Sequence, residues 1–427
     1  MRTLKDFSYY FRQSKVPATV VRAGLLLLVY AVAGAWSATL TLEEALALAD
    51  ENHPRLKAGA ARIDAAAAGI TTARAYPNPE ALAQGGGQTF RVPGNVSGFV
   101  QSYGVVQPLE LGVLRPSRIG LAERTRDVTA QELAAARLLI LSAVRRTFFE
   151  ALRFQGEVDI QRENLRIVED FRERIKVRVE VGEAGRLELY RADAELATAR
   201  ASVLGAQSRH VSALAQLRGA VAAPLGEPLT LEGSLDGGTV LPPLEDLRQE
   251  VLERHPDLAR ARSAVRRSEA RLSYETALRR PQPTLTAGFD RPPDVPIFRA
   301  GISIPLPFWN RREGPIAEAA AETRAASAEA EARQRELLAV LEGAYGRYQF
   351  ATAQLATYEE GVLRAGAEGL RAAEAAYRLG ERGILEVLDA QRVLRTVRLA
   401  IHHAQFDRQA ALIDLDEARA TRLRSSP

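Results

Sequence analysis

Two carboxylates in the last tenth of the chain, Glu386 and Asp389, have the types and spacing that most suggest chemistry. They lie three residues apart, so they share one face if the segment is helical. Carboxylates gathered in a ring around a pore favour cations and repel anions. The alternative is two solvated acids on an ordinary helix face. The pair therefore predicts a cation-favouring constriction only if other elements bring several copies of it together.

The histidines do not predict a metal site. There are five of them, His53, His210, His255, His402 and His403, with no cysteine and with methionine only at position 1. Two of the five precede a proline, which is typical of a break between helical segments. The adjacent pair would point in different directions on one helix. Because a metal site needs more ligands close together, we expect no resident metal and no cofactor.

No segment carries an enzyme signature. Gly85, Gly86 and Gly87 are not followed by Lys and Ser or Thr, so they are not a phosphate-binding loop. Ser142 and Ser202 lie outside any nucleophile motif. We therefore expect a protein that is not an enzyme.

The elements that must position the acids occur twice, about 200 residues apart. Leu42-Glu43-Glu44 returns as Leu244-Glu245-Asp246, Tyr76-Pro77-Asn78-Pro79 as Arg280-Pro281-Gln282-Pro283, Gln107-Pro108-Leu109 as Ile304-Pro305-Leu306, and Gly182-Glu183-Ala184-Gly185 as Gly380-Glu381-Arg382-Gly383. Four matches in the same order indicate a duplicated unit, which is far longer than a solenoid repeat. We assign the first unit to 38–223, a linker to 224–243, the second unit to 244–422 and a tail to 423–427.

The N-terminal residues 1–37 predict an export signal. Basic residues are followed by an apolar stretch at 23–33 and by small residues that offer a cleavage site. The alternative is a membrane anchor, but the stretch is shorter than the roughly 20 residues that a spanning helix needs. Loss of residues 1–35 removes five of the 57 basic and one of the 53 acidic residues, leaving 52 of each. This balance does not indicate a nucleic-acid partner.

Proline placement predicts where the long helices lie. Residues 117–223 and 316–426 contain no proline and are rich in Ala, Leu, Arg and Glu. The expected long helices run over about 117–180 and 315–378, and the returning helices over about 186–220 and 384–422. Paired glycines at each reversal, Gly182 with Gly185 and Gly380 with Gly383, permit a tight turn. The segments 42–76 and 244–280 are expected to be helical as well.

Two segments, 81–107 and 284–304, alternate apolar with small or polar residues, which predicts a β-hairpin in each repeat. Four strands cannot close a membrane barrel, since known single-chain barrels start at about eight. Three chains would supply twelve strands. We therefore expect an obligate oligomer whose membrane part is shared between copies.

The order helix, hairpin, long helix, glycine tip and helix, given twice over about 40–422, resembles the TolC family of outer-membrane efflux ducts. The most specific stretch is 377–391, and 75–80 and 304–314 are similar to the cobalt–zinc–cadmium resistance branch. The resemblance implies a mainly α fold with a small β part. It implies a homotrimer with a twelve-stranded β-barrel in outer-membrane lipid and a long periplasmic α-helical barrel. It also implies two partners, a periplasmic adaptor and an inner-membrane pump of the resistance–nodulation–division type.

The resemblance further implies roles for residues at the tips. Glu386 and Asp389 match the acids of the pore constriction, although the family often has Asp at the first position. Their counterparts in the first repeat are Glu188 and Arg191. Tyr377 and Arg382 match positions that hold the tip closed, and the alternative for the tyrosine is plain packing. The glycine tips, at Gly182, Gly185, Gly380 and Gly383, are expected to dock the adaptor.

Three functions remain open from the sequence. The first is a passive outer-membrane channel of a Gram-negative efflux system for divalent heavy-metal cations. The second is a duct for organic compounds or for polypeptides secreted by a type I system. The third is a periplasmic coiled-coil scaffold without a pore, which would have no use for the two predicted hairpins.

Overall fold

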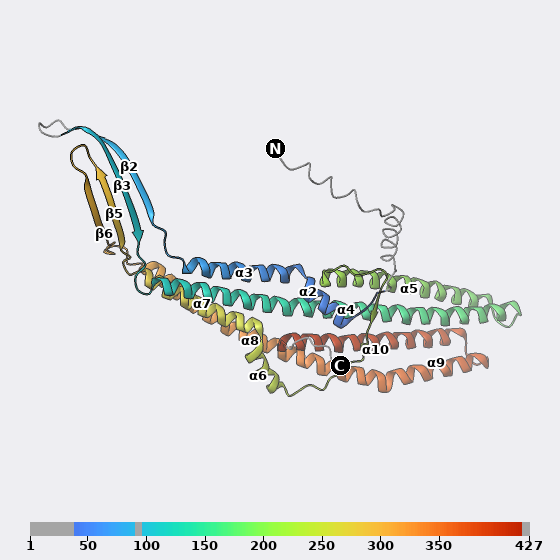
Figure 1. The fold of residues 1–427 in the computed structure, drawn as a ribbon. Helices are drawn as coiled ribbons and strands as arrows, with labels where there is room; N and C mark the ends of the chain where they lie inside the picture. Colours follow the sequence, from blue (N-terminus) through green and yellow to red (C-terminus); the bar gives the residue numbers. More distant parts are fainter. Residues whose placement is uncertain (1–37, 90–95, 421–427) are drawn as a thin grey trace, which may run out of the picture.

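The fold was analysed in a computed structural model, which describes residues 38–89 and 96–420. The predicted signal peptide at 1–37 and the tail at 423–427 lie outside the described residues. The rest is mostly helical, and each repeat contains two short helices, a β-hairpin and a long helical hairpin (Figure 1). Among the described residues, no helix is both long and apolar enough to cross a membrane.

The repeats have the same order of elements. The first contains α2 (Leu42–Asn52), α3 (Pro54–Arg74), β2 (Glu80–Gln88), β3 (Gly98–Pro108), α4 (Leu114–Glu180) and α5 (Arg186–Val221). The second contains α6 (Leu244–Arg254), α7 (Pro256–Leu278), β5 (Thr284–Arg291), β6 (Ile297–Ser303), α8 (Glu313–Thr357), α9 (Leu363–Arg378) and α10 (Ile384–Arg419). The helices and hairpins predicted from proline placement and alternation are confirmed to within a few residues at most of their ends.

The two His-Pro pairs mark helix breaks, as predicted. His53 and His255 are the N-cap residues of α3 and α7, and a proline follows each at the first helical position. The Nδ1 atom of each histidine accepts a hydrogen bond of 3.2 Å from the backbone N–H two residues later. This bond satisfies one of the free donors at the start of a helix.

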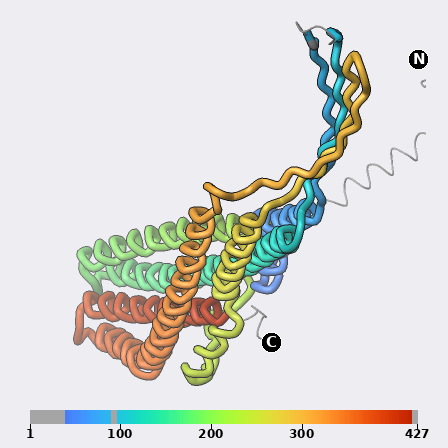
Figure 2. Tube along the Cα trace, turned by 90° about the vertical axis from the view of Figure 1, so that its left-hand side faces the viewer, coloured from blue at the N-terminus to red at the C-terminus, as the bar shows by residue number. Residues whose placement is uncertain are grey.

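The four long strands form one antiparallel sheet in the order β2-β3-β5-β6. The two hairpins meet through β3 and β5, where Tyr103 lies opposite Phe289. Phe289 in turn lies opposite Phe298 of β6, with ring centroids 5.9 Å apart. The sheet extends away from one end of the helical part (Figures 1 and 2). Its outer strands, β2 and β6, each have one edge without a partner strand among the described residues.

The sequence analysis missed a second, two-stranded sheet. Strand β1 (Ala38–Thr41) pairs in parallel with β4 (Leu229–Glu232), so the segment 224–243, expected to be a plain linker, contains a strand. Leu40, Leu229 and Leu231 are buried in a core that Phe148 of α4 and Ile413 of α10 also enter. The linker is therefore packed into the helical body, because its alternating leucines face that core.

The second long helix also differs from the prediction of one continuous helix over 315–378. A π-helical turn at Tyr358–Val362 separates α8 from α9. Such turns insert one extra residue per turn and commonly bend or shift a helix. The corresponding helix of the first repeat, α4, is continuous over 67 residues.

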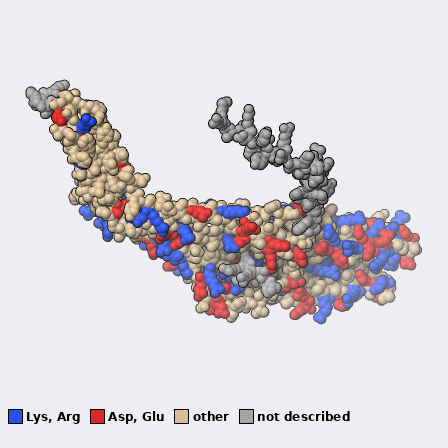
Figure 3. Space-filling view, viewed as in Figure 1, with Lys and Arg blue, Asp and Glu red and all other residues tan. Residues whose placement is uncertain are grey.

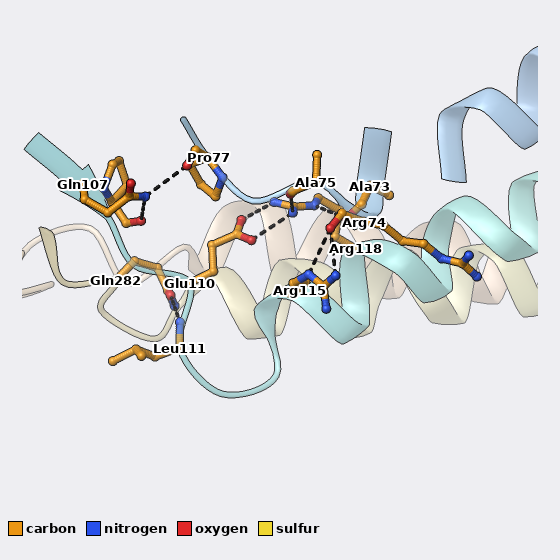
Figure 4. A network of polar contacts seen from close by, with 11 residues as sticks. Ala73, Arg74, Ala75, Pro77, Gln107, Glu110, Leu111, Arg115, Arg118 and Gln282 are labelled. Carbon is orange, nitrogen blue, oxygen red and sulfur yellow. Dashed lines mark hydrogen bonds and ion pairs between the residues drawn. The ribbon is translucent and has the colours of Figure 1, made fainter. Parts of the chain in front are cut away.

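A polar network connects the sheet to the helices (Figure 4). Arg118 of α4 donates to the carbonyl oxygens of Ala73 (3.0 Å) and Ala75 (2.8 Å) at the end of α3, and it also pairs with Glu110. Arg115 donates to the carbonyl oxygen of Arg74 at 2.8 and 3.1 Å. These arginines satisfy the free carbonyls at the C-terminus of α3. They fix the point where the chain leaves the helical part for β2.

Candidate functional site

The two helical hairpins end side by side, at the end of the molecule opposite the sheet (Figures 1 and 2). One tip joins α4 to α5 and the other joins α9 to α10. Gly182 and Gly380 have φ of +81° and +73°, a left-handed conformation that strains any residue with a Cβ. Gly185 and Gly383 are N-caps in ordinary extended conformation, at φ of −82° and −80°. Only the first glycine of each pair is therefore required by the turn itself.

A small apolar core joins the two tips. Its buried members come from four helices, α4, α5, α9 and α10, and from both repeats; they are Ile175, Ala192, Tyr377, Ile384, Val387 and Leu388. The ring of Phe171 lies 6.1 Å from that of Tyr377. Burial of these side chains holds the second hairpin against the first.

Tyr377 also makes a polar link between the hairpins. It is 9% exposed, and its hydroxyl donates a 2.9 Å hydrogen bond to Oε2 of Glu188 on α5. The guanidinium of Arg178 lies over the tyrosine ring, 4.8 Å from its centroid. Burial, followed by the bond to Glu188, raises the pKa of Tyr377 to about 12. The hydroxyl therefore remains a donor at every physiological pH, and both packing and hydrogen bonding hold this residue in place.

Arg382 is not brought into this link. Its side chain is exposed, and it makes no ion pair with any residue in the part of the chain that the structure describes. Its backbone N–H donates to the carbonyl oxygen of Ala376 at 3.4 Å, within the turn. Within one chain, the structure thus gives Tyr377 a partner and leaves Arg382 free for another molecule.

Glu386 and Asp389 lie in the first two turns of α10, on the face away from the tip core. Both are exposed, whereas Val387 and Leu388 beside them are buried. Neither carboxylate makes an ion pair with a residue of 38–89 or 96–420. The pair therefore presents two carboxylates without a direct ion pair to whatever lies on that side of the hairpin.

The sequence analysis missed an ion pair one turn further along α10. Arg392 donates to Oε2 of Glu195 on α5 from Nε at 3.1 Å and from Nη2 at 2.6 Å. Arg395 lies on the other side of the same carboxylate, at 4.0 Å. Glu195 is two helical turns beyond Glu188, so one face of α5 binds the second hairpin at two levels about 10 Å apart. The spacing of the two glutamates was visible in the sequence, but their partners were not.

The histidines lie elsewhere and do not converge. The Nε2 atom of His402 lies 2.8 Å from the carbonyl oxygen of Arg153, which is a contact between α10 and α4. Burial lowers the pKa of His210, His255 and His403. In the described part of the chain, no three His, Asp or Glu side chains are grouped as metal ligands would be.

The chain is similar to a known protein family. The model of the family described as outer membrane efflux protein matches residues 45–223 and 247–421. The cobalt-zinc-cadmium resistance protein CzcC of Cupriavidus metallidurans is 31% identical over 371 residues, which cover 84% of this chain and 85% of that protein. The outer membrane protein TolC of Vibrio cholerae is 24% identical over 393 residues, covering 87% and 89%.

Solved structures have the same fold. That of CusC superposes with a TM-score of 0.76 at 19% identity, covering 88% of this chain and 91% of that chain. The open-state outer membrane channel MtrE of Neisseria gonorrhoeae superposes with a TM-score of 0.73 at 20% identity, covering 88% of each.

Proposed function

Because the chain belongs to the outer membrane efflux protein family, we propose that it forms the outer-membrane channel of a tripartite efflux system. Three copies form the channel. It is a passive conduit that a periplasmic adaptor connects to an inner-membrane pump of the resistance–nodulation–division type. Its cargo is divalent heavy-metal cations.

The observation that carries this proposal is the open four-stranded sheet. A sheet within lipid must pair every backbone N–H and C=O, since no water is available there. Among the described residues, the outer edges of β2 and β6 have no partner strand. Pairing β2 of one copy with β6 of the next closes the sheet, and three copies give twelve strands.

The surface of the sheet supports a place in lipid. Large apolar side chains stand exposed on it; they include Leu82, Phe99, Tyr103, Val105, Phe298 and Ile302. Figure 3 shows few charged residues over the sheet and many over the helices. An exposed apolar surface of this kind marks a site of contact with lipid or with another protein. The third candidate, a periplasmic scaffold without a pore, gives this surface no role.

The acids of α10 support a cation-favouring constriction. Threefold assembly with Glu386 and Asp389 facing the axis places six unpaired carboxylates around the tunnel. Such a ring attracts cations and repels anions. The test is the reversal potential of the purified channel in a planar lipid bilayer under a salt gradient.

The Glu386→Gln, Asp389→Asn double variant should lose most of the cation selectivity of the wild-type channel and conduct more current. The matched control is Glu368→Gln, which removes an exposed acid of α9 that pairs with Arg371. If the double variant kept the selectivity and conductance of the wild type, the constriction would lie elsewhere.

The metal cargo rests on the relative named for cobalt, zinc and cadmium resistance and on the unpaired carboxylates. A strain that lacks this protein should become sensitive to those cations, and the gene returned on a plasmid should restore growth. Sensitivity to organic compounds or loss of a secreted polypeptide, without metal sensitivity, would favour the second candidate.

The tips support adaptor docking. Each presents two exposed apolar side chains at positions related by the repeat, Val181 and Leu187 on one tip and Leu379 and Leu385 on the other. Paired apolar residues at the end of a helical hairpin suit contact with the hairpin of a partner. The Leu187→Asp, Leu385→Asp variant should lose co-purification with the adaptor while keeping its channel activity. Retained co-purification would contradict this docking site.

A further inference from the structure

Asp389 has a basic neighbour on its own helix that it does not bind. Asp389 and Arg392 are three residues apart on α10, a spacing at which opposite charges commonly pair. In the structure, Arg392 turns instead to Glu195, with bonds of 2.6 and 3.1 Å. The exposed carboxylate of Asp389 is left without an ion pair in the described part of the chain.

The reason for this choice is burial. Glu195 is 5% exposed, and a buried carboxylate without a partner is strongly unfavourable. The planar guanidinium of Arg392 supplies two donors to it. An exposed pair between Asp389 and Arg392 would contribute only about 0–1 kcal/mol. The buried carboxylate of Glu195 therefore binds Arg392 in preference to the exposed carboxylate of Asp389.

Resting on the constriction proposed above, we infer that Glu195 is a selectivity-determining residue, which acts by holding Arg392 away from Asp389. It lies on α5 and does not itself belong to the acid pair. With Glu195 in place, each copy offers two free carboxylates to the tunnel. Without it, Arg392 is free to lie beside Asp389, and the net negative charge of the ring falls by up to half.

The arrangement belongs to the second tip alone. At the offset of 198 that relates the two tips, Arg392 corresponds to Ala194 and Glu195 corresponds to Val393. The first hairpin thus has no counterpart of this ion pair. An ion pair that only kept two hairpins together could use any arginine. The pair with Glu195 uses Arg392, which is the only basic residue within four positions of Asp389 along the chain.

The test compares three variants of the assembled channel in planar bilayers. Glu195→Leu removes the buried carboxylate and fills its site. Glu195→Leu with Arg392→Gln also removes the released arginine that lies three residues from Asp389, while Arg395, 4.0 Å from Glu195, is unchanged in both variants. The matched control, Asp193→Asn, breaks the 2.8 Å ion pair between Arg172 and Asp193, which joins α4 to α5 near the same level.

Glu195→Leu should lower the cation-to-anion permeability ratio by up to about twofold, because the released Arg392 lowers the net negative charge of the ring. The double variant should restore the wild-type ratio, and Asp193→Asn should leave it unchanged. A wild-type ratio in Glu195→Leu would overturn the inference, and so would a double variant as impaired as the single one, because both results would give Glu195 a mechanical role only. If the Glu386→Gln, Asp389→Asn variant had the same permeability ratio as the wild type, that result would instead refute the constriction itself.

Discussion

The hydrogen bond from Tyr377 to Glu188 predicts that Tyr377→Phe loosens the contact between the two tips of one chain. Phenylalanine keeps the packing against Phe171 and the contact with Arg178, so only the hydroxyl is lost. Removal of that hydroxyl leaves the carboxylate of Glu188 without its donor from the second hairpin. The free energy that keeps the two hairpins together falls by the contribution of that bond.

The size of the effect follows from the geometry. A hydrogen bond to an ionised group contributes about 1.5–3 kcal/mol, and the partly exposed Glu188 places this one near 1.5 kcal/mol. In the proposed trimer, three copies would lose about 4.5 kcal/mol together, which would change the ratio of open to closed channels roughly a thousandfold. The matched control is Tyr190→Phe, since Tyr190 is 65% exposed near the first tip.

The assay is single-channel recording in planar bilayers. Tyr377→Phe should show a larger conductance or a larger open fraction than the wild type, whereas Tyr190→Phe should match it. The raised pKa of Tyr377 keeps its hydroxyl a donor at every pH below about 10, and this donor is lost only as the pH rises through about 12. The difference between variant and wild type should therefore be the same at pH 6 and pH 9. Identical records for Tyr377→Phe and the wild type would refute the reasoning.

Three further predictions concern turns, the junction and pH. Gly380→Ala should destabilise the second tip by about 1–2 kcal/mol, because alanine is strained at positive φ. Hydrogen exchange at the substituted tip should be faster than the exchange at the first tip in Gly185→Ala. Arg118→Met should lower the thermal unfolding midpoint by removing hydrogen bonds that contribute about 2–3 kcal/mol. The control Arg126→Met, at a half-exposed arginine, should leave the midpoint unchanged. Burial lowers the pKa of His255, so its stabilising contribution is present above the unfolded value of about 6.5 and is lost as the pH falls through the lower, folded value. His255→Asn, which keeps an N-cap acceptor, should lose less stability than the wild type between pH 7.5 and 5.5.

The helical hairpins and the four strands of the main sheet were predictable because their signals are local. Long tracts that lack proline and are rich in helix formers predicted α4 and α5. The alternation of apolar with small or polar residues predicted β5 and β6. The His-Pro pairs were correctly interpreted as breaks. The repeat itself supplied a check, since each element had to appear twice.

The elements that were missed depend on distant partners. Strand β4 has only four residues, and its partner β1 lies about 190 residues earlier in the chain. No local sequence pattern predicts a pairing between strands this far apart in the chain. The π-helical turn at Tyr358–Val362 occurs in a sequence that is compatible with an ordinary helix. The turn has no buried residue that would explain it.

In the candidate site, too, residues could be predicted from local signals, but contacts between residues far apart in the chain could not. The acids and Tyr377 could be selected from their types and spacing and from the resemblance. Their partners could not, because Glu188 and Glu195 lie about 190 to 200 residues before Tyr377 and Arg392. The sequence analysis treated Glu188 only as a repeat counterpart of Glu386, and the structure makes it the acceptor for Tyr377. Arg382 has no partner in the described part of the chain, so a role in closing the tip needs a second copy and stays a prediction.

The central claim is that the open sheet of one chain is completed by other copies. Native mass spectrometry of the protein extracted from outer membranes in mild detergent tests it most directly. The account predicts a species of three chains, in which β2 of each copy pairs with β6 of its neighbour. A single chain as the only species would contradict it.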